Sequence, residues 1–226
     1  MMKQIFNYII LNNILAFFIV LPLSAQVNKD TAKVSVPLYR GFTVELDMVP
    51  SAEYLLTKGV NRGLQGNLQF NLKEKFFPVI EIGYGGADKT LRSGTRYAGG
   101  GVYERIGIDF NLVKPNIYKN SFFVGMRLGM SNFSYDIKNI TLADNYWGGS
   151  ESIDINSNSA TKFWFEIVGG MRVNVYKGFT MGWSVRNKRL LGNSENEDGL
   201  TPWFIPGYGK NNFSNWGFSY VIGYRF

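Results

Sequence analysis

The residues of this chain that could do chemistry are arginines and carboxylates at alternating positions of apolar segments. Paired ions of this kind form either buried salt bridges or a path for ions. The chain has no histidine and no cysteine, which excludes Ser–His and Asp–His catalysis and thiolate metal sites. The interior set is Glu45, Asp47, Glu81, Arg105, Asp109, Arg127, Glu166, Arg172, Arg186 and Arg225.

Other catalytic chemistry stays open in principle, because carboxylates alone or a Ser–Lys pair can act without histidine. No spacing in the chain points to either arrangement, and Gly99-Gly100-Gly101 precedes a strand rather than a helix, unlike a phosphate loop. We therefore expect no enzyme, no catalytic residue, no cofactor and no metal site.

The charged residues lie in segments that alternate between bulky apolar and small or polar side chains. In residues 122–130, for example, Val124, Met126 and Leu128 alternate with Gly125 and Arg127. Successive side chains on a strand point to opposite faces, so each such segment is predicted to be a strand with one apolar face. No segment after the N-terminal region has a helical period. The predicted strands are 42–48, 64–72, 78–84, 102–112, 122–130, 163–175, 179–188 and 216–226.

The connections between these strands alternate in length. The segments 73–75, 113–120 and 177–178 are short, whereas 49–61, 85–101, 131–161 and 189–212 are long. An even number of antiparallel strands can close without an unpaired edge, and short turns opposite long loops are typical of outer-membrane barrels. The sequence therefore predicts an all-β fold, an eight-stranded antiparallel transmembrane up-and-down β-barrel with both termini periplasmic.

A soluble barrel or sandwich would show the same alternation, with the bulky face as its core. Here the other face carries many glycines, such as Gly83, Gly107 and Gly125, with isolated charges of both signs. A solvated face would carry more Lys, Glu and Thr, whereas eight strands enclose just enough room for side chains. We expect the interior ions to form a salt-bridged plug; the alternative is a gated or leaky ion path.

The N-terminal residues have the layout of a secretory signal peptide. Lys3 precedes a mostly apolar stretch, and Leu23-Ser24-Ala25 forms a small-residue cleavage site. The alternative is a retained transmembrane helix, but the uninterrupted apolar run covers only 14–23 and is shorter than the roughly 20 residues needed. The predicted organisation is a signal peptide at 1–25, a periplasmic lead-in at 26–37 and an outer-membrane barrel at 38–226.

The last strand ends in Tyr224, Arg225 and Phe226, with large apolar side chains at alternate positions back to Trp216. This ending resembles the closing strand of Gram-negative outer-membrane barrels, which implies that Tyr224 and Phe226 act as the terminal assembly signal. Over its mature length the chain resembles the small eight-stranded outer-membrane barrels of the outer-membrane protein A transmembrane-domain type. More narrowly, Ser24-Ala25-Gln26 and the strand 181–186 resemble a barrel family of Bacteroidota, some of whose members are associated with the barrel-assembly machinery.

The long loops are the places where a partner would bind. Their aromatic residues suggest contact with a protein, a glycan or lipopolysaccharide; the alternative is that these rings form an aromatic girdle or pack across the barrel mouth. Calcium at Asp144, Glu151 and Asp154 is a weaker reading. The net charge of +7 includes no basic run, so no nucleic acid is expected. The candidate loop residues are Tyr135, Trp147, Trp203, Phe204 and Tyr208.

Three functions follow from this reading of the sequence. The first is a non-enzymatic outer-membrane barrel that is a structural or accessory subunit of an envelope complex, with the barrel-assembly machinery as one such complex. The second is a surface receptor or adhesin that binds through its long loops, and the third is a narrow channel. All three place the chain in outer-membrane lipid beside lipopolysaccharide, inserted by the barrel-assembly machinery.

Overall fold

The computed structural model describes residues 37–113, 120–143, 150–192 and 201–226. The predicted signal peptide and nearly all of the predicted lead-in lie outside these residues. Within them, no helix is long and apolar enough to cross a membrane. The elements are β1 (Tyr39–Asp47), α2 (Val49–Leu56), β2 (Asn61–Leu72), β3 (Phe76–Thr90), β4 (Arg96–Asn111), β5 (Ser121–Ala143), β6 (Ser150–Tyr176), β7 (Phe179–Leu191), β8 (Phe204–Ile205), β9 (Gly209–Lys210) and β10 (Ser214–Arg225).

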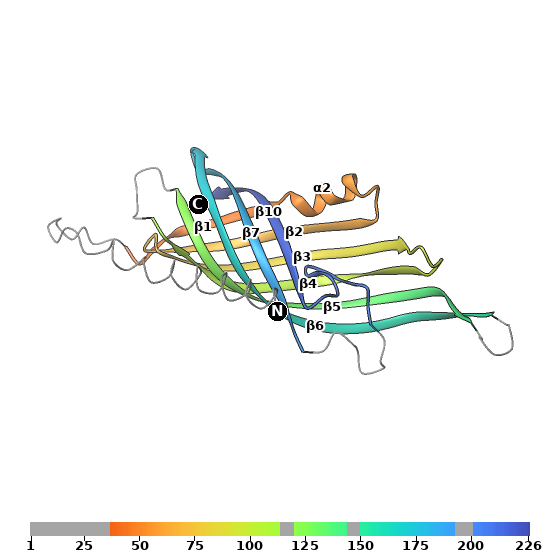
Figure 1. Ribbon diagram of the computed structural model, residues 1–226. Coiled ribbons are helices and arrows are strands. Elements are labelled where there is room, and N and C mark those ends of the chain that lie inside the picture. The colour runs from red at the N-terminus through yellow and green to blue at the C-terminus, as the bar shows by residue number, and fades with distance from the viewer. Residues whose placement is uncertain (1–36, 114–119, 144–149, 193–200) are drawn as a thin grey trace, which may run out of the picture. The chain divides into compact units, whose positions relative to one another are not determined.

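The eight long strands form a closed antiparallel barrel, which confirms the predicted fold (Figure 1). The strand order is β1-β10-β7-β6-β5-β4-β3-β2, so each strand pairs with its sequence neighbours and β10 closes onto β1. At this seam Thr43 pairs with Arg225, and the ring of Phe226 stacks on Phe42 at 4.9 Å. The first and last described strands therefore meet at one end, the turn end, which also carries the β2–β3 and β6–β7 turns.

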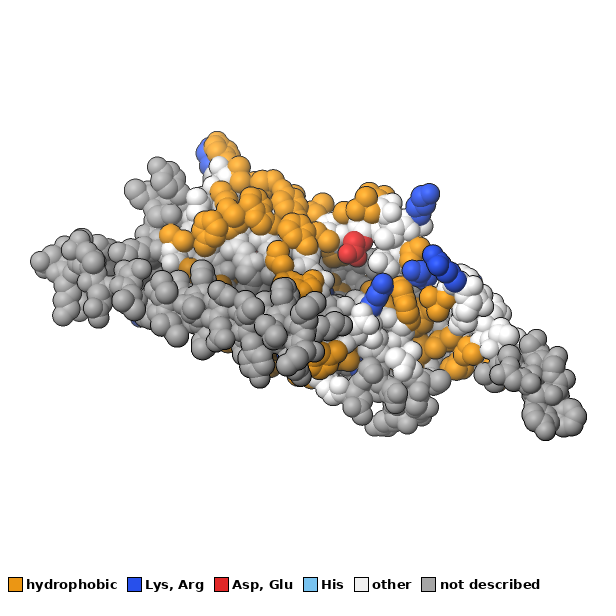
Figure 2. All heavy atoms as spheres, viewed as in Figure 1, with side chains coloured by type: hydrophobic (Ala, Val, Ile, Leu, Met, Phe, Trp, Pro, Cys, Tyr) orange, Lys and Arg blue, Asp and Glu red, His pale blue; other side chains and the backbone are white. Residues whose placement is uncertain are grey.

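The bulky apolar side chains face outward, whereas in a soluble barrel they face the interior. On β5, Phe122, Val124 and Met126 are exposed on the outside, while Phe123 and Arg127 are buried inside. The outward apolar side chains of the eight strands make up the apolar belt, part of which is visible on the face shown in Figure 2. Away from the turn end, the belt reaches Met48, Leu64, Tyr84, Val102, Met130, Phe163, Val185 and Trp216 on the successive strands.

Beyond the belt the outward residues become polar, as the change from Met130 to Asn132 and Ser134 on β5 shows. This opposite end of the barrel is the hairpin end. Glu104 is an exposed carboxylate on the outward face of β4, opposite Met130 at the edge of the belt. The register of β4 is regular on both sides of Glu104, so no bulge turns its side chain inward.

Several predicted loops are in fact strand. β5 has 23 residues and β6 has 27, more than twice the roughly 9–11 that cross a bilayer, and most of the predicted loop 131–161 is their paired extension. Polar residues can continue a hairpin because backbone hydrogen bonds need no apolar side chain. The predicted loop 49–61 also contains a short helix, α2. α2 follows β1 directly, has proline in its first turn and buries none of its residues, so it left no periodic pattern.

Candidate functional site

The centre of the barrel contains a closed set of buried ions, which we call the ion network. Four arginines come from β4, β5, β6 and β7, and four carboxylates come from β1, β3, β4 and β6. Each occupies an inward position because the strand alternation places it there. The members are Glu45, Glu81, Arg105, Asp109, Arg127, Glu166, Arg172 and Arg186.

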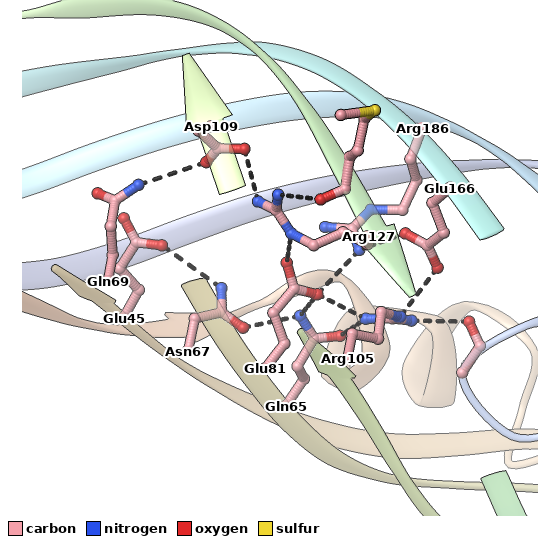
Figure 3. Close-up of polar contacts among 12 residues, drawn as sticks. Glu45, Gln65, Asn67, Gln69, Glu81, Arg105, Asp109, Arg127, Glu166 and Arg186 are labelled. Atoms are coloured by element: carbon pink, nitrogen blue, oxygen red, sulfur yellow. Dashed lines mark hydrogen bonds and ion pairs between the residues drawn. The ribbon is translucent and has the colours of Figure 1, made fainter. Parts of the chain in front are cut away.

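Glu81 is the hub of the network (Figure 3). Its carboxylate accepts hydrogen bonds from Arg105 Nη1 at 2.8 Å, Arg127 Nε at 3.1 Å and Arg186 Nη1 at 3.0 Å. Arg105 and Arg186 also pair with Glu166, at 2.9 and 3.1 Å. These residues therefore form a ring of alternating charge across the lumen.

A second branch extends from Arg127 toward the seam. Arg127 Nη2 lies 2.7 Å from Asp109 Oδ1, and Arg172 Nη1 donates to Asp109 Oδ2 at 3.1 Å. Arg172 Nε then donates to Glu45 Oε1 at 2.7 Å. Each of the four arginines thus pairs with two carboxylates, and the network is formally neutral. Removing one member would leave a buried charge uncompensated, at a cost of roughly 3–5 kcal/mol.

Amides and glycines support the ion pairs. Gln69 Nε2 donates to Asp109 and Gln65 Nε2 donates to Glu81, at 3.3 and 3.2 Å. At Gly125 a Cβ atom would collide with the Asp109 carboxylate, so glycine gives the arginines and carboxylates room to meet. The strand alternation predicts that these amides face inward. Their hydrogen bonds to the carboxylates could not be predicted, because the partners are far apart in the sequence.

Two predicted interior residues are not among these eight ions. Asp47 is buried at the end of β1, where its Oδ1 accepts hydrogen bonds from the backbone N–H groups of Val49 and Tyr220 at 3.0 and 3.3 Å. Its carboxylate therefore binds the backbone where β1 leads into α2, and it is not one of the eight ions. Arg225 lies at the last position of β10, opposite Thr43 at the turn end.

The connection between β7 and β10 folds back into the mouth at the hairpin end. Its short β8–β9 hairpin buries Ile205 and Tyr208 completely. Lys188 Nζ donates to the carbonyls of Gly207 and Tyr208 at 2.6 and 3.2 Å, and Arg105 Nη2 donates to Gly207 at 2.7 Å. We call this hairpin the stopper, because it fills the mouth of the barrel, where the inward-facing Lys188 and Arg105 bind its backbone. Neither its strands nor these contacts were predicted.

The predicted loop aromatics gather around this stopper. Tyr135 is buried and stacks on Tyr97 at 5.8 Å, and the Tyr208 ring lies 5.8 Å from that of Trp164. Trp203 and Phe204 pack partly buried against the same cluster. Burial leaves no free surface on Tyr135 or Tyr208 for a partner, whereas Trp203 and Phe204 keep part of theirs. Trp147 lies outside the described residues.

Of the remaining predicted residues, Tyr224 and Phe226 are exposed at the turn end, where their rings contact edge to face at 4.9 Å. Asp144 lies outside the described residues. The Asp154 carboxylate accepts a hydrogen bond from the backbone of Asn139 at 2.8 Å. Among the residues whose side chains are described, no group of three or more Asp or Glu residues could hold a metal.

Residues 1–226 match the family model described as "Domain of unknown function (DUF6048)". The chain belongs to this family. Among solved structures, the DUF6048 chain is similar to Ail, the attachment invasion locus protein of Yersinia pestis, solved in complex with the heparin analogue sucrose octasulfate. The identity is 12%, the TM-score is 0.40, and the match covers 82% of this chain and 94% of Ail. No curated protein matches the chain.

The chemistry available in the lumen of this DUF6048 protein depends on how its arginines and carboxylates are paired. A general acid or base must have a proton site within reach of a substrate. Each carboxylate of the ion network is instead engaged by one or more arginines, and the stopper lies between the network and the hairpin end. The arrangement is suited to joining, across the lumen, the strands that supply these ions.

Proposed function

We propose that the chain is an integral outer-membrane β-barrel protein, with a lumen filled by the ion network, that serves as a structural or accessory subunit of an envelope complex. One observation carries this proposal: the apolar belt faces outward while the ion network is buried inside. In water the belt would be an exposed apolar surface far larger than soluble proteins carry. In a bilayer the same arrangement is stable, because the closed sheet satisfies its own backbone hydrogen bonds.

The orientation in the membrane follows from the lengths of the connections at the two ends of the barrel. Outer-membrane barrels place short turns in the periplasm and long loops outside. The turn end would therefore face the periplasm together with the first and last strands, and the hairpin end would face outward. This orientation agrees with the predicted signal peptide, and the barrel-assembly machinery and lipopolysaccharide would then be partners during and after insertion.

The buried ion pairs and the stopper support a protein that neither conducts nor catalyses. A conducting path needs ion sites that are occupied weakly enough to release their ions. Here the lumen is filled by mutually paired side chains and closed by Ile205 and Tyr208. If the protein neither conducts nor catalyses, it acts by contact with other molecules. This favours the role of an accessory subunit.

A second candidate, a surface receptor or adhesin, is favoured by the long β5–β6 hairpin. Its strands continue past the belt from Ser131 to Ala143 and from Ser150 to Lys162. In the proposed orientation this hairpin projects from the cell surface. Trp203 and Phe204, which are partly exposed beside its base, would add to its contact surface.

The membrane assignment is tested by an arginine scan of one face of β5. Leu128→Arg places a charge within the belt, and Asn132→Arg places the same charge on the same face beyond it. In lipid vesicles we expect Leu128→Arg to lower the free energy of unfolding by about 2–4 kcal/mol and Asn132→Arg to have little effect. Equal stabilities of the two variants would contradict a lipid-facing belt.

Affinity purification in mild detergent separates the two candidate roles. Stoichiometric co-purification with a larger barrel and periplasmic lipoproteins would support the accessory subunit. Deleting the β5–β6 extension beyond Ser131 and Lys162 should leave that complex intact but abolish binding by a receptor. A monomer that loses surface binding on this deletion would instead establish the receptor.

A further inference from the structure

The barrel wall has a lateral opening at the hairpin end, which we call the wall notch. β1 ends at Asp47, where it pairs with Val221 of β10 on one side and Gln65 of β2 on the other. β10 continues to Ser214 and β2 begins at Asn61, so both strands extend past the end of β1. Between these extensions no described strand completes the wall.

α2 occupies the position that a longer β1 would have filled. It continues from β1 and runs beside β2 (Figure 1). Val49, Pro50 and Glu53 line the cavity under the notch, while Leu55 and Leu56 are among the most exposed apolar side chains of the described chain. A helix cannot pair with the strand edges, so it covers the opening without sealing it.

The cavity under the notch has a volume of about 170 Å³ and is lined from both sides of the wall. Inward residues of the lumen, including Arg186 and Lys188, form its floor. Outward residues of the apolar belt, including Trp216 and Phe218, form its rim. The notch therefore connects a cationic interior site directly to the surface that we assign to lipid.

Three basic side chains line this site. Arg186 is buried, and its guanidinium pairs with Glu81 and Glu166 at the floor. Lys188 Nζ donates to two carbonyls, although an ammonium has three protons to donate. Arg62 is exposed on β2 at the rim. An oxygen-rich anionic group satisfies such donors better than water does.

Two carboxylates also line the cavity, and their negative charge would repel a bound anion. Asp47 is already engaged by the backbone of Val49 and Tyr220. Glu53 is exposed on α2 at the outer side, so water screens its charge. The donors at the floor thus define the anion site, and Glu53 limits its affinity.

We propose that the wall notch binds the anionic headgroup of a membrane lipid, with the acyl chain lying outside along Trp216 and Phe218. The inference rests on the proposed outer-membrane location. The cavity suits a phosphate or carboxylate headgroup, and a whole lipid exceeds it, so the chain must follow the rim. The exposed Tyr54, Leu55 and Leu56 of α2 extend the apolar surface beside the notch.

The test uses the mature protein folded in neutral detergent, with binding measured by native mass spectrometry. The probes are dodecyl phosphate, dodecanol and inorganic phosphate, which separate the charged head from the chain. We expect dodecyl phosphate to bind more tightly than either of the others. Arg62→Gln should weaken it roughly tenfold, the effect of one charge-assisted hydrogen bond, and Glu53→Gln should strengthen it.

Arg96→Gln is the matched control, because Arg96 is an exposed arginine at the same end that pairs with Asp88 and does not line the notch. Equal binding of dodecyl phosphate and dodecanol would overturn the proposal, as would equal losses in Arg62→Gln and Arg96→Gln. Tight binding of inorganic phosphate alone would replace the lipid by a free anion. The membrane location fails separately, if the Leu128→Arg and Asn132→Arg variants are equally stable in vesicles.

Discussion

Arg127 offers the sharpest test of the ion network, because it links the two branches. Its side chain is about 1% exposed and pairs with Glu81 at 3.1 Å and Asp109 at 2.7 Å. Arg127→Met keeps most of the side-chain volume and removes the charge, which leaves the lumen with one carboxylate too many. We expect the free energy of unfolding to fall by about 3–5 kcal/mol. This corresponds to a change of roughly 10²- to 5 × 10³-fold in the unfolding equilibrium.

The double variant Arg127→Met with Asp109→Asn distinguishes lost charge balance from lost packing. It leaves three arginines facing three carboxylates, so the remaining network is neutral again. We expect it to recover more than half of the stability lost by Arg127→Met alone, since contacting residues of one network are strongly coupled. Arg96→Met is the surface control and should change stability by less than about 0.5 kcal/mol.

Urea titration in lipid vesicles, followed by tryptophan fluorescence and heat-modified gel migration, measures all three variants. Equal losses in the single and double variants would show that Arg127 and Asp109 are uncoupled and would refute the charge-balance reasoning. Planar-bilayer conductance gives a second readout. A large rise in conductance for Arg127→Met at unchanged stability would mean that the lumen is an ion path.

Three further predictions concern the stopper, the seam and the surface. Lys188→Met should raise the rate of proteolysis within the β8–β9 hairpin of the folded protein, whereas Lys210→Met, on the exposed side of that hairpin, should not. Deleting Phe226 removes a ring stack and a backbone hydrogen bond from the seam, so thermal unfolding should report a loss of roughly 1–3 kcal/mol. Beyond the belt, hydrogen bonds from Arg96 hold the pKa of Asp88 below its ordinary value of 3.8. The stabilisation from this pair is therefore present above pH 3.8 and lost as the pH falls further, and Arg96→Gln should return the carboxyl pKa, read by NMR, toward 3.8.

Most of the fold could be predicted from the alternation of apolar and polar side chains in the sequence. A residue such as Leu128 or Arg127 is assigned to the outside or the inside by its parity alone, because strand side chains alternate strictly. Strand number and antiparallel order followed from this pattern and the turns. The lengths of β5 and β6 did not, since polar segments that pair with each other look like loops in sequence.

The sequence by itself determined that the apolar side chains face outward and that arginines and carboxylates share the lumen. Only the tertiary structure decided which of them meet: Glu45 and Arg172 are far apart in the chain and pair because closure of β10 onto β1 places β1 three strands from β6 in the ring. The extension of β2 and β10 past the end of β1 and the inward fold of the β8–β9 hairpin were decided at the same level. Parity fixes the side of the wall on which a residue lies, whereas register and closure fix its height and its neighbours.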